Sequence, residues 1–267
     1  MTSTPLTSTP VSSKLGNFIW YELLTSDVDK AARFYGAVVG WKSEPSQMPG
    51  MDYRPWVIDG QMVGGLMAIP AQGAAEGMRP VWLGYVSVEN VDRTIGDVLA
   101  TGGTLVMPAT DIPGVGRIAM IADPQGAALY VMTPNSTATS QVYAPGKPGH
   151  GGWHELHSSN WEAGLTFYGK LFGWGRSDAL DMGPMGTYLL FNAGGDAIGG
   201  MMNNPHAPRP FWLYYFNVDD IMAAKHRVEA AGGTIVRDPH EVPGGSWILQ
   251  AQDDQGAMFA LIGPHKG

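Results

Sequence analysis

Two glutamates, Glu22 and Glu155, occupy the same place in two similar stretches of the sequence, each among aromatic residues. Burial beside Trp and Tyr side chains raises the pKa of a carboxyl group and suits it to general acid and base chemistry. His157 follows Glu155 by two positions, so both side chains share one face of an extended strand. Such a pair can exchange protons or, with a ligand from another strand, hold a divalent metal. The alternative is that each glutamate is a paired core carboxylate or faces solvent, and that His157 is a satisfied core or interface residue.

Strand alternation places further candidates beside these groups. Tyr130 offers a hydroxyl to a substrate oxygen, or is a core aromatic residue. Arg117 ends a Gly- and Pro-rich loop that could cover the first pocket, where its guanidinium would meet an anionic substrate, although a plain turn is the alternative. His154 points to the opposite face and is expected at a packing interface. The catalytic candidates are therefore Glu155, His157, Glu22 and Tyr130, and the substrate-binding candidates are Trp20, Tyr85, Trp153, Tyr215, Asn217 and Arg117.

An internal repeat spans the chain. The matching segments are Trp20-Tyr21-Glu22-Leu23 with Trp153-His154-Glu155-Leu156, Phe34-Tyr35-Gly36 with Phe167-Tyr168-Gly169, Gly102-Gly103-Thr104 with Gly232-Gly233-Thr234, and Gln125-Gly126-Ala127 with Gln255-Gly256-Ala257. Self-similarity over this length indicates a duplicated domain. We predict domains at 17–133 and 151–264, a flexible tail at 1–16, and a Pro/Gly/Ser/Thr-rich linker at 134–150.

Each half divides again into two modules of one strand, one helix and about three strands. In the first half we expect strands at 18–25, 81–88, 104–107, 117–122 and 127–132, two or three short strands before 69, a loop from there to 80, and helices from Ser26 or Asp27 to about 39 and over 90–100. In the second half we expect helices near 161–172 and 221–231. Four βαβββ modules of this kind predict an α+β fold with curved antiparallel or mixed sheets.

Several of these segments carry a family resemblance: Thr25-Ser26-Asp27, Phe34-Tyr35, Gly40-Trp41, Ser87-Val88-Glu89-Asn90, Gly102-Gly103-Thr104 and Asp123-Pro124-Gln125-Gly126. On them the chain resembles the vicinal oxygen chelate superfamily, which includes glyoxalase I, bleomycin resistance proteins and extradiol dioxygenases. The resemblance covers both halves and implies two tandem glyoxalase-like domains, each with a U-shaped sheet around a cavity. One fold supports many chemistries, so the reaction must come from the site.

In metal-using members of this superfamily, four ligands line the concave side of the sheet. The resemblance places these positions at Trp20, Gly65 or Leu66, Leu83 and Tyr130, and in the second half at Trp153, Gly200 or Met201, Leu213 and Ala260. None is a histidine or a carboxylate. The usual chelate site is therefore expected to be lost, and no cofactor is expected. A divalent metal at a non-standard site near Glu155 and His157 is the alternative.

Composition narrows the function classes. The net charge is −8, and no two Lys or Arg residues are adjacent, which disfavours nucleic-acid binding. The chain has no cysteine, so thiolate chemistry is excluded, and it lacks the apolar stretch of a membrane span. We expect a cytoplasmic monomer or homodimer that binds a small molecule.

These observations favour a lyase or isomerase that acts on a small carbonyl or aromatic compound, with a Glu general base and without the usual metal ligands. One alternative is a protein that sequesters a drug or metabolite, as bleomycin resistance proteins do. Another is a metal-dependent glyoxalase or dioxygenase with a non-standard ligand set. The two pockets should differ, because Leu24 and Tyr130 correspond to His157 and Ala260. If only one works, the Glu/His pair favours the second.

Overall fold

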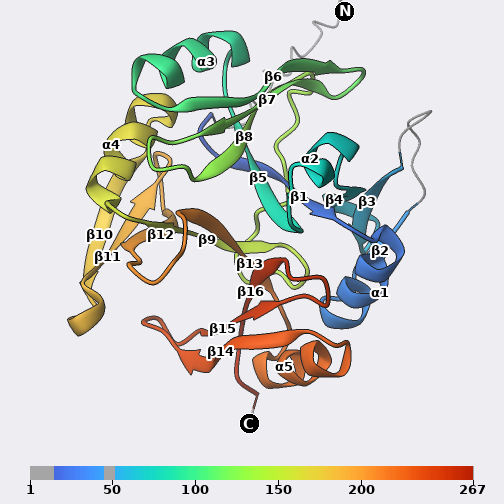
Figure 1. Cartoon of the computed structure of the whole chain (residues 1–267). Helices are drawn as coiled ribbons and strands as arrows, with labels where there is room; N and C mark the ends of the chain where they lie inside the picture. The colour runs from blue at the N-terminus through green and yellow to red at the C-terminus, as the bar shows by residue number, and fades with distance from the viewer. Residues whose placement is uncertain (1–14, 45–51, 267) are drawn as a thin grey trace, which may run out of the picture.

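The computed structural model describes residues 15–44 and 52–266 and contains two curved sheets with the same strand order (Figure 1). The first sheet has the order β2-β3-β4-β1-β5-β8-β7-β6. Its strands are β1 (Phe18–Thr25), β2 (Lys42–Ser43), β3 (Tyr53–Ile58), β4 (Gln61–Ala68), β5 (Val81–Ser87), β6 (Thr104–Ile112), β7 (Gly116–Ala122) and β8 (Ala128–Pro134). The antiparallel pair β1–β5 joins two modules, and β1–β4 and β5–β8 are parallel.

The second sheet repeats this topology in the order β10-β11-β12-β9-β13-β16-β15-β14. Its strands are β9 (Gly151–Ser158), β10 (Gly175–Asp181), β11 (Thr187–Asn192), β12 (Ala197–Asn203), β13 (Phe211–Asn217), β14 (Thr234–Glu241), β15 (Trp247–Gln252) and β16 (Met258–Gly263). The predicted α+β architecture of two tandem, curved-sheet units is confirmed.

Side-chain caps start the four main helices, α1 (Val28–Val38), α3 (Val91–Ala100), α4 (Trp161–Phe172) and α5 (Ile221–Ala230). Asp27, Asn90, Asn160 and Asp220 each accept a hydrogen bond from a backbone N–H in the first turn, which satisfies a donor that the helix leaves free. One prediction is wrong: the segment after β4, expected as a loop, contains the short helix α2 (Ala71–Ala75). None of the helices in the described residues has the length and apolar character needed to cross a bilayer.

Each sheet has a face covered by helices, here called the helix face, and a face away from them, here called the open face. On β1, Tyr21 and Leu23 pack on the helix face, whereas Trp20 and Leu24 belong to a separate cluster on the open face. The helix-face core runs through both halves, so the repeat does not form two independent cores.

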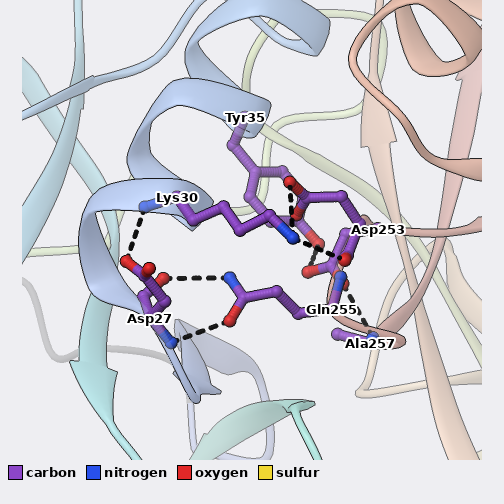
Figure 2. Close-up of polar contacts among 7 residues, drawn as sticks. Asp27, Lys30, Tyr35, Asp253, Gln255 and Ala257 are labelled. Carbon is purple, nitrogen blue, oxygen red and sulfur yellow. Dashed lines mark hydrogen bonds and ion pairs between the residues drawn. The ribbon is translucent and has the colours of Figure 1, made fainter.

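The two halves are locked together by the repeated Asp-x-Gln-Gly segments (Figure 2). The Gln255 carboxamide accepts a hydrogen bond from the backbone N–H of Asp27 at 2.7 Å and donates one to the Asp27 carbonyl at 2.9 Å. Beside it, the Tyr35 hydroxyl on α1 donates to Asp253 Oδ2 at 3.1 Å. Gln125 makes the equivalent bonds to Asn160 at the start of α4. Each half thus holds the first helix of the other half against its own sheet.

Candidate functional site

A cavity of about 660 Å³ lies on the open face of the second sheet. Most of its wall is apolar or aromatic, with Trp153, Leu180, Met182, Met185, Tyr188, Leu190, Met202, Tyr215, Ile248 and Ile262, and its polar lining groups include Glu155, Arg237, His240, Glu241 and Gln250. Backbone segments at 145–146 and 242–246 border it as well. A volume of this size and a mainly apolar lining are typical of small-molecule sites.

Glu155 on β9 is the buried acid of this cavity, with only 5% of its surface exposed. Its Oε2 accepts a hydrogen bond from the Tyr188 hydroxyl at 2.8 Å, and its Oε1 accepts one from Gln250 Nε2 at 3.3 Å. Burial raises the pKa of Glu155, but the contacts with His157 and Tyr188 outweigh it and hold the pKa below its usual value. The cavity therefore has an ionised carboxylate in its wall at neutral pH.

His157 stands next to this carboxylate and does not line the cavity. Its Nε2 lies 2.7 Å from Glu155 Oε1, and its ring stacks on Phe211 with centroids 4.6 Å apart. Asn204 fixes the tautomer: its Oδ1 accepts from two backbone N–H groups, so its Nδ2 donates to His157 Nδ1, at 3.0 Å. The neutral imidazole then carries its proton on Nε2, the nitrogen nearest Glu155.

A glycine opposite the acid makes room for the tyrosine that holds it. Gly200 on β12 pairs with Glu155, and a Cβ on Gly200 would overlap the ring of Tyr188. The ring can therefore cross β12, accept a hydrogen bond from Trp153 Nε1 at 2.8 Å and donate to Glu155. Gly65 and Tyr53 repeat this arrangement in the first half.

The residues on this face do not fit the metal site that the resemblance implies. The position of one expected ligand, Gly200, lies under a tyrosine ring, and Leu213 and Ala260 at two others have no donor atoms. Within residues 15–44 and 52–266, no three His, Cys, Asp or Glu side chains gather so as to hold a metal ion. Glu155 and His157 supply two donors, fewer than the three protein ligands common in catalytic zinc sites.

In the first half, side chains fill the equivalent space. Tyr130 stacks on Tyr85 with ring centroids 4.3 Å apart, inside an apolar cluster with Leu24 and Met120. Glu22 is 4% exposed there and accepts a hydrogen bond from the Tyr85 hydroxyl at 3.0 Å. Burial raises its pKa to about 7, despite the hydrogen bonds it accepts from tyrosines.

One row of paired residues across each sheet explains why the second half has a cavity where the first half has packed side chains. In the second half the row is Trp153, Tyr215, Ala260, Gln250 and Arg237, on β9, β13, β16, β15 and β14. In the first half the same row is Trp20, Tyr85, Tyr130, Met120 and Met107. The second half thus replaces a stacked tyrosine by alanine, which leaves the space open, and two methionines by polar residues.

The structure brings some of the predicted site residues together and separates others. Glu155, Trp153 and Tyr215 line one cavity, with His157 behind Glu155. Glu22, Trp20, Tyr85 and Tyr130 form the filled cluster of the first half.

Two substrate-binding predictions do not match the geometry. The Arg117 guanidinium does not reach the open face, because Arg117 lies within β7 and alternates with Ile118; it forms ion pairs with Asp92 and Asp111 at 2.9 and 3.0 Å. Asn217 lies at the cavity wall, but its amide accepts from Gly146 N and donates to two backbone carbonyls. The amide of Asn217 therefore holds the connecting segment in place.

Several residues of the cavity wall were not predicted from the sequence, among them Tyr188, Gln250 and Arg237. The repeat itself held a signal for two of them, because a position-by-position alignment of the halves sets Gln250 against Met120 and Arg237 against Met107. A change from an apolar to a polar residue at matching positions of the two open faces marks a site of altered use.

Comparison with known proteins gives consistent results. A family model described as the Glyoxalase/Bleomycin resistance protein/Dioxygenase superfamily matches residues 17–131 and again residues 152–261. The chain is 32% identical over 248 residues to CFP32 of Mycobacterium tuberculosis, provisionally named a glyoxylase, covering 92% of this chain and 94% of that protein. It is 28% identical over 261 residues to the anthracycline biosynthesis protein DnrV of Streptomyces peucetius, covering 93% of each. The Mn(II)-bound glyoxalase from Novosphingobium aromaticivorans matches with a TM-score of 0.66 at 17% identity, over 95% of this chain and 84% of that one.

Proposed function

Because the chain belongs to the glyoxalase/bleomycin resistance protein/dioxygenase superfamily, we propose that its second half is a lyase or isomerase in which Glu155 removes a proton next to a carbonyl group. One observation carries the proposal: a buried, ionised carboxylate forms part of the wall of an otherwise mainly apolar cavity. Such a carboxylate is free to accept a proton at neutral pH, and the apolar wall keeps water away from the reacting carbon.

The assigned roles follow from the contacts at Glu155. Its carboxylate takes the proton from carbon, and the Tyr215 hydroxyl, which is hydrogen-bonded to Glu155, turns to donate to the developing enolate oxygen as that carboxylate is neutralised. Burial raises the pKa of Tyr215, so its hydroxyl stays protonated. The proton then returns to the far end of a conjugated enolate in an isomerisation, or a leaving group departs with its electron pair from the carbon next to the deprotonated one in an elimination. His157 and Tyr188 act as positioning residues, because each contacts the Glu155 carboxylate and neither exchanges a proton with the substrate.

The substrate class follows from the cavity wall. Methionine and leucine side chains and a volume of about 660 Å³ suit a flat, apolar or aromatic carbonyl compound. The similarity to a protein named for anthracycline biosynthesis supports an aromatic substrate.

A sequestering protein is the second candidate, and the pKa of Glu155 favours it. A carboxylate held below its usual pKa is a weak base, whereas it still attracts a ligand that donates hydrogen bonds. The metal-dependent alternative would need ligands beyond Glu155 and His157, and among the residues that the structure describes no third His, Cys, Asp or Glu joins them.

Proton exchange separates these functions. 2-Tetralone, an aromatic ketone with acidic protons beside its carbonyl, is incubated with the protein in deuterated water, and loss of the proton signals is followed by NMR. We expect exchange above the rate without protein. Quenching of tryptophan fluorescence by 2-tetralone with no added exchange would support sequestration instead.

Ala260→Tyr tests whether the cavity is the site. The first half has Tyr130 at this place, stacked on Tyr85, so the fold accommodates the ring, and Tyr215 offers the same stacking partner. We expect the new ring to occupy the cavity and to lower the affinity for 2-tetralone and the exchange rate by about tenfold or more. An unchanged melting temperature is the control, and unchanged binding would place the site elsewhere.

His157→Leu tests the role assigned to the histidine, since the first half has Leu24 at this position. Without the imidazole, burial dominates, and the pKa of Glu155 should rise toward the value of about 7 found for Glu22. We therefore expect the acid limb of the exchange-rate profile to move up by about one pH unit or more, because the base must be ionised. A profile that does not move would show that Tyr188 and Gln250 suffice to hold the charge.

A further inference from the structure

Arg237 is a cation in the cavity lining for which the proposed reaction has no use. It lies on β14, and no carboxylate in the described part of the chain forms an ion pair with it. Burial raises the pKa of Tyr215, and the positive charge of Arg237 opposes that rise to a smaller extent. Arg117 and Arg54, by contrast, are each paired with two aspartates. A guanidinium is a fixed fork of donors that suits carboxylates and similar anions.

Strand irregularities lie on both sides of this residue. The register of β14 on β15 shifts between Ile235 and Arg237 and again between Arg237 and His240. The same two shifts flank Met107 in the first half, so they belong to the duplicated fold, and the residue type at this position is what differs between the halves. Arg237 pairs with Gln250, whose Nε2 donates to Glu155 and, at 3.1 Å, to Tyr215.

The negative and positive side chains of the cavity wall lie apart from one another. Arg237 on β14 is one end of the five-strand row that contains the small Ala260, and Trp153 on β9 is the other end. Glu155 lies two residues along β9 from Trp153, on the same face. The cavity also contains Glu241, but this residue pairs with Trp247 four positions further along β14, about 13 Å away at the usual rise per residue. An anionic group would therefore be repelled from the Glu155 end and attracted to the Arg237 end.

The first half shows what the same row looks like where aromatic and apolar side chains pack together. There Met107 replaces Arg237 and packs against the apolar cluster, and Met120 replaces Gln250. The cation is present in the half with the cavity and is replaced by a methionine in the half that is filled. A structural requirement of the fold for a positive charge at this place is thereby ruled out.

We propose that Arg237 forms an anion subsite and that the ligand is a flat, apolar molecule with an acidic oxygen, such as a carboxylate, at the end away from Glu155. This inference rests on the proposed function in one respect: both assume that the cavity of the second half binds the ligand. The subsite orients the ligand: its anionic end meets Arg237, its apolar body lies among Met182, Met202 and Ile248, and its other end reaches the base.

A matched pair of fluorescent probes tests the subsite: 2-anthracenecarboxylate and its neutral analogue 2-anthracenecarboxamide. Fluorescence titrations give the affinity of each for the wild type, Arg237→Met and Arg117→Met. Arg237→Met installs the residue of the first half, and Arg117→Met removes a cation that faces away from the cavity. We expect the wild type to prefer the acid by about tenfold, the lower end of the range for a hydrogen bond to a charged group.

In Arg237→Met the acid should lose this advantage while the amide binds as before, and Arg117→Met should change neither affinity. Added salt should weaken binding of the acid and not of the amide. Equal affinities in the wild type, or an Arg237→Met variant that keeps the preference, would overturn the subsite and leave the cavity in place. If Ala260→Tyr leaves both probes bound, or if neither probe binds the wild type, both the subsite and the proposed use of the cavity fail.

Discussion

Glu155→Gln is expected to lower the rate of proton exchange by about 10²- to 10⁴-fold, the usual contribution of a positioned general base. The substitution keeps the size of the side chain and one oxygen that can accept from Tyr188, but an amide cannot take a proton from carbon. Affinity for 2-tetralone, measured by quenching of tryptophan fluorescence, should change little, because the apolar wall supplies most of the contact. The effect is therefore expected in the rate at saturation rather than in binding.

Glu22→Gln is the matched control, since Glu22 occupies the same position of the repeat but lies in the filled cluster of the first half. It should leave the exchange rate unchanged. If Glu155→Gln exchanges protons as fast as the wild type, the base lies elsewhere and binding becomes the better account of the cavity. If Glu22→Gln abolishes exchange instead, the assignment of the active half is reversed.

Much of the fold could be predicted because its signals are local. Asp27 and Asn90 mark helix starts by residue type, and alternation along one uninterrupted strand puts Glu155 on the open face and His154 on the other. In the structure His154 lies between the halves, with Nε2 2.7 Å from the Tyr21 hydroxyl, as expected for a packing residue.

The remaining features depend on contacts between distant segments. The Asp-x-Gln-Gly segments carried the family resemblance, but nothing local indicates that Gln125 and Gln255 each bind the start of a helix in the other half. The sequence predicts Arg117 at the end of a loop. In the structure β7 begins one residue before Arg117, so its side chain lies on the helix face. Arg237 was missed because two register shifts interrupt the alternation of β14.

The duplication shows how one scaffold can serve two purposes. Both halves keep the Trp–Tyr–Glu arrangement and the glycine that makes room for the tyrosine. They differ at two positions near the acid. The first half has Tyr130 and Leu24 where the second half has Ala260 and His157. The same glutamate consequently has a lowered pKa in one half and a raised pKa in the other.

That contrast predicts a pH-dependent stability effect of Glu22→Gln. The pKa of Glu22 is raised from 4.5 to about 7, so the folded protein holds a proton that the unfolded chain releases between these values. Stability from this group is fully present below the unfolded pKa and is lost as the pH rises through about 7. The loss is about 3 kcal/mol, from a shift of about 2.5 units at about 1.4 kcal/mol each. Glutamine cannot ionise. The free energy of unfolding of the variant, relative to that of the wild type, should therefore increase by about this amount as the pH rises from about 4 to about 8.

The measurement is the free energy of unfolding in urea for both proteins across this pH range, and the quantity of interest is their difference. Other groups shape the profile of each protein: His154, whose pKa burial lowers to about 3, makes stability rise with pH up to its unfolded value of 6.5. This contribution is common to both proteins and cancels in the difference. A difference that stays constant with pH would mean that Glu22 has the same pKa in the folded and unfolded states, and that its tyrosine partners offset the cost of burial.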